Sequence, residues 1–161
     1  MKEQQYQFSY KEYDSIDELP EDQQWLLNEA REVTETAYAP YSHFQVAAVA
    51  RMANGQIVAG SNQENASFPV GLCAERVLLA SVSSLFPKVP VDTIAISYKS
   101  ETQKSDHPIS PCGICRQSLQ EFESRVGHPI QLIMGGMSGK VIVVDTASKL
   151  LPLAFTSDEL R

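Results

Sequence analysis

The sequence predicts a single α/β domain, a three-layer α/β/α sandwich built around a mixed five-stranded sheet. Segments with helical apolar spacing alternate with short, nearly continuous apolar segments that are typical of buried strands. This alternation favours a sheet enclosed between helices. The length of 161 residues suits one core, and no repeat or shift in composition marks a second domain.

Three segments have the pattern of helices. Residues 19–38 repeat apolar side chains at helical spacing, with Pro20 at a place suited to the first helical position. Residues 73–86 and 112–122 are the second and third, and both of these begin with a cysteine.

Five apolar segments are predicted as strands: 43–52, 57–61, 91–100, 130–136 and 140–146. Asn54-Gly55 between the first two is a strong hairpin signal. Residues 1–18 are expected to be a polar extension, loosely ordered or lying at an edge, ahead of a domain over 19–161.

Composition narrows the classes of partner. The formal net charge of −7 repels a phosphate backbone, and the 13 Lys and Arg residues form no basic patch, so we expect no nucleic acid partner. No apolar run is long enough to cross a bilayer, so no membrane association is expected. The polar, acidic first residues lack the pattern of a secretory signal, and the cytoplasm is the expected location.

The chain has only three cysteines, Cys73, Cys112 and Cys115, an odd number that suits a metal site better than disulfides in a reducing cytosol. Cys112 and Cys115 are three residues apart, on one face of a helix start. The positive end of a helix favours a thiolate. With Cys73 as a third ligand, the set predicts one Zn²⁺ per chain with an open fourth position.

Two other interpretations of the cysteines stay open. One is a closed structural site with a histidine as fourth ligand, although none of His43, His107 and His128 stands at close ligand spacing to a cysteine. The other is a redox pair of Cys112 and Cys115, which leaves Cys73 without a role.

Three charged residues follow the cysteines closely. Glu75 lies two residues after Cys73, where a carboxylate beside a metal can take a proton from the attacking water and pass it on. Arg76 and Arg116 lie where they can donate N–H groups to a thiolate and draw charge away from the metal. Taken singly, Glu75 would be a complement to the helix dipole, and each arginine a solvated surface residue.

Several segments together resemble the zinc-dependent cytidine deaminases. The segments "YSHF" (41–44), "NQENAS" (62–67), "GLCAER" (71–76), "SPCGICRQ" (110–117) and "LLPLAF" (150–155) are similar to family segments in family order. They span most of the chain. The resemblance implies the fold of that family, zinc on the three cysteines, and Glu75 as the proton carrier.

The resemblance also implies substrate contacts. Asn62 and Glu64 are similar to the pair that binds the ribose 3′-hydroxyl, and a carboxylate with an amide can indeed both accept from and donate to a hydroxyl. Backbone groups near Ala74 are expected to hold the base. Phe44 resembles the aromatic residue that packs on the pyrimidine, and Phe68 one near the intersubunit site.

The assembly expected from the resemblance is a small homotetramer with shared active sites. Phe155 resembles an aromatic residue that reaches in from a neighbouring subunit. Without the motifs, these aromatic residues would be read as core and Asn62 and Glu64 as turn-capping residues.

The activity expected from this resemblance is hydrolytic deamination of cytidine and 2′-deoxycytidine to the uracil nucleosides and ammonia, in pyrimidine salvage. Alternatives are a deaminase of another amino-heterocycle such as blasticidin S, a non-catalytic zinc module that mediates assembly, and a thiol-disulfide oxidoreductase.

Overall fold

Residues 1–160 are described by a computed structural model of the chain, in which one mixed sheet forms the centre. The parallel pair is β4 with β5, and every other neighbouring pair is antiparallel. The order across the sheet is β1-β6-β5-β4-β2-β3. The strand bounds are β1 Lys11–Tyr13, β2 Phe44–Met52, β3 Ile57–Ser61, β4 Val91–Ser100, β5 Gln131–Gly135 and β6 Val141–Val144.

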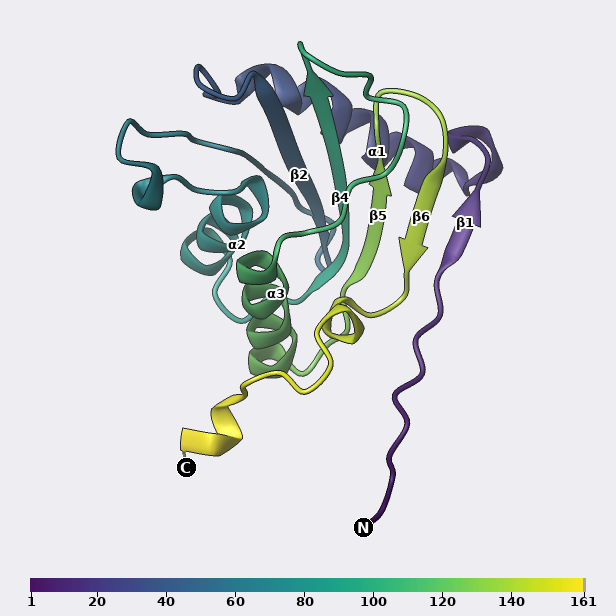
Figure 1. The fold of residues 1–161 in the computed structure, drawn as a ribbon, viewed down its shortest axis with the longest axis vertical. Helices are drawn as coiled ribbons and strands as arrows, with labels where there is room; N and C mark the ends of the chain where they lie inside the picture. Colours follow the sequence, from purple (N-terminus) through teal and green to yellow (C-terminus); the bar gives the residue numbers. More distant parts are fainter. Residues whose placement is uncertain (161) are drawn as a thin grey trace.

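Helices cover both faces of this sheet, which confirms the predicted α/β/α sandwich. Figure 1 shows α1 (Glu21–Val33) on one face, and α2 (Ala74–Leu85) and α3 (Gly113–Val126) on the other. The larger core lies under α2 and α3 and includes Leu78, Ile96 and Leu119, while the smaller one lies under α1. Among residues 1–160, no helix is both long and apolar enough to cross a membrane.

The prediction of five strands was wrong by one, because β1 lies within residues 1–18. Only three residues long, β1 carries no apolar alternation, and its place at the sheet edge rests on backbone pairing with β6. Lys11 adds an ion pair with Asp145 at 3.2 Å. Part of the extension, residues 11–13, therefore lies at a sheet edge, which was one of the two arrangements expected for residues 1–18. The division of the chain at residue 18 stays a prediction.

Helix α1 is shorter than the predicted 19–38. It begins at Glu21, directly after Pro20, and gives way to a 3₁₀ turn at Thr34–Thr36. The hydroxyls of Thr34 and Thr36 donate to the carbonyls of Arg31 and Val33 three residues earlier. Threonine side chains that bond to nearby backbone in this way compete with regular helix bonds, which explains the early end.

Strand directions bring the starts of α2 and α3 to one edge of the sheet. Strands β3 and β4 both run antiparallel to β2, so they are parallel to each other, and β4 is parallel to β5. Helix α2 connects β3 to β4, and α3 connects β4 to β5. Each helix must therefore start where the preceding strand ends, which is the edge where α/β folds place their ligand sites.

Gly60 lets α2 approach β3 closely. A Cβ added at Gly60 would lie 2.5 Å from the backbone nitrogen of Leu78 and 2.8 Å from the carbonyl oxygen of Ala74. Any side chain at this position would push the first half of α2 away from the sheet.

A buried carboxylate ties the end of α3 to the C-terminal part of the chain. Glu123 Oε1 accepts hydrogen bonds from the backbone N–H of Ile130 at 2.6 Å and of Ala147 at 2.9 Å, and its Oε2 accepts from Ser148 at 2.9 Å. These bonds hold the 3₁₀ helix η4 (Ala147–Leu150) against α3. They also give the backbone N–H groups the hydrogen-bond partners that buried polar groups need.

Candidate active site

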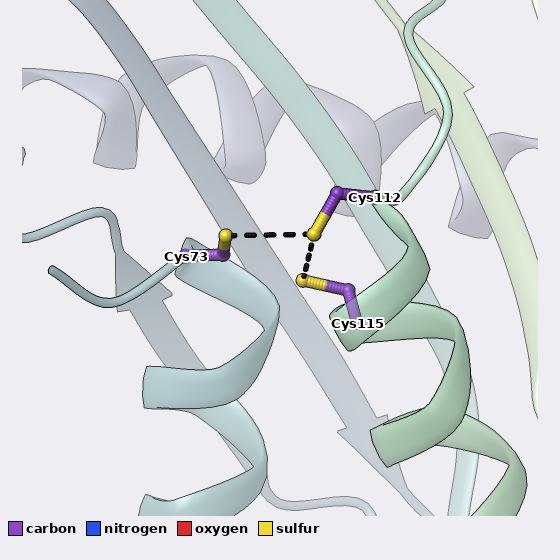
Figure 2. A group of neighbouring side chains, drawn as sticks. All are labelled: Cys73, Cys112 and Cys115. Carbon is purple, nitrogen blue, oxygen red and sulfur yellow. Dashed lines mark hydrogen bonds between the residues drawn. The ribbon is translucent and has the colours of Figure 1, made fainter. Parts of the chain in front are cut away.

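The three cysteines converge at the starts of α2 and α3. Cys73 directly precedes α2 and Cys112 directly precedes α3, while Cys115 lies in the first turn of α3. Figure 2 shows the three sulfurs turned toward one another. The Sγ atoms of Cys73 and Cys112 lie 3.8 Å apart, and those of Cys112 and Cys115 lie 3.5 Å apart.

This spacing fits a zinc ion. Tetrahedral zinc at about 2.3 Å from each sulfur separates its ligands by about 3.8 Å. All three sulfurs lie within 4.8 Å of one another. A disulfide would need an S–S distance of about 2.05 Å. The residues present therefore suit a shared metal, with room for a fourth ligand that the protein does not supply.

The histidines do not complete the set. Within residues 1–160, Cys73, Cys112 and Cys115 are the only group of three or more metal-binding side chains that converge. His43 lies 3.1 Å from Glu101, His107 3.1 Å from the Tyr98 hydroxyl, and His128 2.9 Å from Asp92. A closed site with a histidine ligand is therefore not the arrangement found.

Hydrogen bonds among the cysteine side chains shift their pKa values in opposite directions. A hydrogen bond from Cys115 lowers the pKa of Cys73 to about 6, with a smaller contribution from the positive charge of Arg76. The same hydrogen bond, followed by burial, raises the pKa of Cys115. Three thiolates so close together repel one another, so a cation is needed to hold them all, and its binding releases protons.

Glu75 lies in the first turn of α2, with 5% of its surface exposed. Burial raises the pKa of its carboxyl, and a hydrogen bond with Cys115 works in the opposite direction. A carboxyl group whose pKa is raised by burial gives up a proton less readily than a free one, which suits a group that must accept and return protons in general acid–base catalysis.

The two arginines have different surroundings. Arg76 is half-buried, and its charge acts on Cys73. Arg116 donates through Nε to the carbonyl of Pro111 at 2.8 Å and through Nη1 to that of Leu150 at 3.2 Å. Arg116 thus fixes the backbone next to Cys112, a contact that the sequence did not indicate. A role for either arginine in drawing charge from a thiolate stays a prediction.

A cavity of about 530 Å³ opens beside the sulfurs, within the size range of small-molecule sites. It brings together most of the predicted site residues: Asn62, Glu64, Phe68, Cys73, Ala74, Glu75 and Cys112. Sequence reasoning missed Tyr41, Ser42, Val46 and Ile109, which also line it. Their positions within or beside the segments "YSHF" and "SPCGICRQ" are the signal that could have found them.

Asn62 and Glu64 are fixed by backbone groups. Asn62 Oδ1 accepts from the N–H of Val46 at 2.7 Å, and its Nδ2 donates to the carbonyl of Phe44 at 2.9 Å. Glu64 Oε2 accepts from the N–H groups of Tyr41 and Ser42, at 2.9 and 3.3 Å. Burial opposes ionisation of Glu64, but hydrogen bonds from the Ser42 hydroxyl and from these two N–H groups outweigh it and lower its pKa.

The three predicted aromatic contacts have different placements. Phe68 lines the cavity and is 75% exposed, with its ring against that of Tyr41. Phe44 does not line the cavity; its ring stacks on Tyr98 at 4.9 Å. Phe155 is exposed, and its carbonyl accepts from Gln117 Nε2 at 2.9 Å. Substrate contacts by these residues stay predictions.

Three convergent sulfurs and a buried carboxyl beside one cavity, on an α/β/α sandwich, are the arrangement of zinc-dependent hydrolytic deaminases. Residues 20–127 match the family model described as the cytidine and deoxycytidylate deaminase zinc-binding region, and the chain belongs to this family.

Relatives and solved structures agree. The chain is 37% identical over 140 residues to a cytidine deaminase from Halalkalibacterium halodurans. This alignment covers 87% of the chain and 98% of the relative. The crystal structure of a cytidine deaminase from Burkholderia pseudomallei superimposes with a TM-score of 0.70 at 35% identity, and covers 81% of this chain and 97% of that one. A blasticidin-S deaminase from Bacillus cereus is 30% identical over 134 residues, 81% of this chain and 90% of the relative.

Replacement of one sulfur should empty the metal site. We expect Cys112→Ala to lower the zinc content from one ion per chain to well below one, because two thiolates hold zinc far more weakly than three. The free energy of unfolding should fall by about 2.7 kcal/mol or more at zinc concentrations above 100 times the dissociation constant. Metal analysis and thermal denaturation measure both quantities.

Ser118→Ala, a change on the exposed face of the same helix, is the matched control and should alter neither quantity. Full zinc occupancy in Cys112→Ala would contradict ligation by this residue.

Proposed function

We propose that the chain deaminates cytidine and 2′-deoxycytidine hydrolytically, giving uridine and 2′-deoxyuridine with release of ammonia. The observation that carries the proposal is the buried Glu75 carboxyl, which lines one cavity together with Cys73 and Cys112, two of the three convergent cysteines. The names and the extent of the relatives support the substrate class.

In the proposed mechanism, the metal site activates the attacking water and the Glu75 carboxyl transfers protons. Cys73, Cys112 and Cys115 would hold the zinc ion, which would supply an activated water as nucleophile at neutral pH. Glu75 takes one proton from the attacking water and gives it to N3 of the ring. It then takes the second proton from the hydroxyl newly attached to C4 and gives it to the leaving amine. The raised pKa of Glu75 suits this exchange, because the carboxyl must hold a proton between two steps.

Substrate orientation falls to groups on the cavity wall. Glu64 uses Oε2 for the backbone N–H groups of Tyr41 and Ser42, so its Oε1 is directed to the ribose 3′-hydroxyl in this proposal. Asn62 has a second amide N–H to offer the same hydroxyl. The backbone at Ala74 and the loop at Ser110 line the cavity where the base would lie.

A deaminase of blasticidin S is the second candidate, since a relative of that name covers 81% of the chain. The fixed Asn62 and Glu64 pair favours a substrate with an ordinary ribose. A non-catalytic zinc module would not need a buried acid in an open cavity, and an oxidoreductase would not need a third sulfur. The net charge of −7 disfavours polynucleotide substrates.

For the wider setting we propose a cytoplasmic enzyme of pyrimidine salvage that works as a homotetramer with shared active sites. Apolar side chains gather around the cavity mouth and the start of α3 and are exposed: Phe68, Val70, Leu72, Ile114 and Phe155. Exposed apolar clusters of this kind are typical of interfaces.

Light scattering should give a solution mass four times that of the chain, and Phe155→Ala should lower the activity of an intact tetramer. A monomer that turns over cytidine at full rate would contradict the shared site.

The proton carrier is tested by Glu75→Gln, which keeps the size of the side chain and removes its basicity. We expect ammonia release from cytidine to fall by about 10³-fold, within the range of general acid–base contributions, with zinc content unchanged. Glu121→Gln on α3 is the control and should keep full activity. Retention of activity within tenfold in Glu75→Gln would contradict the assigned role, and blasticidin S assayed in parallel distinguishes the two candidate substrates.

The ribose contact is tested by Glu64→Gln with two substrates. We expect the KM for cytidine to rise about 10-fold to 100-fold, because a charged acceptor is lost from one hydrogen bond. The KM for 3′-deoxycytidine, which lacks the hydroxyl, should be the same in wild type and variant. An equal loss on both substrates would mean that Glu64 supports the loop rather than the sugar.

A further inference from the structure

A buried tyrosine lies beside the cavity in an aromatic stack. Tyr98 on β4 has no exposed surface and is among the largest fully buried side chains of the described residues. Its ring lies 4.9 Å from that of Phe44 at an interplanar angle of 19°, and 5.7 Å from that of His107 at 66°. Both are favourable aromatic geometries.

The Tyr98 hydroxyl connects the sheet to the segment 101–110. The Tyr98 hydroxyl donates a hydrogen bond to the carbonyl oxygen of Lys104 at 3.4 Å. The hydroxyl oxygen also lies 3.1 Å from Nδ1 of His107. Asp106 Oδ1 lies 3.4 Å from the same histidine nitrogen. A buried hydroxyl thus finds its partners in a polar loop rather than in the sheet.

Tyr98 connects two segments that supply lining residues on different sides of the cavity. On the sheet side it pairs in register with Val46, which lines the cavity, and it stacks on Phe44, two residues earlier on the same face of β2. On the loop side, His107 comes two residues before Ile109, which lines the cavity together with Ser110.

The rest of the loop is held elsewhere. Its middle is fixed at Ser105, whose hydroxyl accepts from the N–H of Ser100 and whose carbonyl accepts from that of Ser138. Its end is fixed by Arg116, which binds the carbonyl of Pro111. Residues 107–110 lie between these two anchors, and the bond between His107 and Tyr98 joins this part of the loop to β4.

We propose that Tyr98 and His107 are positioning residues that hold the sheet wall and the loop wall of the base pocket at a fixed separation. This inference rests on the proposed function, because it assigns the pocket between Val46 and Ile109 to the pyrimidine. Neither residue touches the three sulfurs or Glu75. Their loss should therefore weaken binding of substrate and transition state alike, which raises KM and leaves kcat unchanged.

The experiment compares Tyr98→Phe, His107→Ala and the double variant with wild type in cytidine turnover. Each single variant should raise KM about fivefold to tenfold, the effect of one hydrogen bond, with kcat within twofold and zinc content unchanged. Because both changes break the same bond, the double variant should show the same increase as each single one. Tyr98→Leu, which also removes the stack on Phe44, should raise KM further.

A second measurement separates positioning from stability. Cytidine binding by calorimetry, with each change placed in the Glu75→Gln background, should show the same fivefold to tenfold loss without turnover. His128→Ala is the matched control, since it removes a histidine paired with Asp92 at 2.9 Å near the far end of β4. It should leave KM unchanged.

Three results would overturn the inference. An unchanged KM in Tyr98→Phe, with a lowered melting temperature alone, would make the pair merely structural. A fall in kcat together with zinc content would place its effect on the metal site instead. Failure of the wild-type protein to release ammonia from cytidine would overturn the proposed function, and the inference with it, and this assay comes first so that the two failures are distinguished.

Discussion

The site depends on one constraint, the parallel direction of β3, β4 and β5. Because each crossover helix starts where its strand ends, α2 and α3 present their first turns at the same edge of the sheet. Three cysteines at these turns then meet without help from any flexible segment. Gly60 completes the arrangement by letting α2 lie directly against β3.

The same geometry brings the negative charge of three thiolates together, and several neighbouring groups offset this charge. Two helix starts direct their positive ends toward the sulfurs. Arg76 adds a positive charge near Cys73. Glu75 is buried beside these groups, and burial disfavours its ionisation. The charge of a bound cation would therefore affect how readily Glu75 gives up its proton.

Much of this could be predicted from the sequence, because periodicity and motif spacing are local. The segments that became α2, α3 and the five longer strands have clear apolar patterns. The motifs "CAER" and "PCGIC" predicted the three cysteines that converge and the buried Glu75 beside them. Strand β1 could not be predicted because its three residues have no apolar alternation, and its backbone bonds and ion pairs join it to residues more than 120 positions away. The contact of Arg116 with Leu150 and the stack of Phe44 on Tyr98 join residues far apart in the chain, and no local pattern encodes them.

Strand β1 also changes how the sheet meets other molecules. Without it, the sheet would end at β6, an unbroken apolar strand over Val141–Val144 with its backbone groups free to pair. Such an edge is a template for aggregation. The extension covers it with the charged residues Lys11 and Glu12, which lie outside the span that matches the family. Residues 11–13 therefore replace a wholly apolar sheet edge with a shorter edge that carries charged side chains.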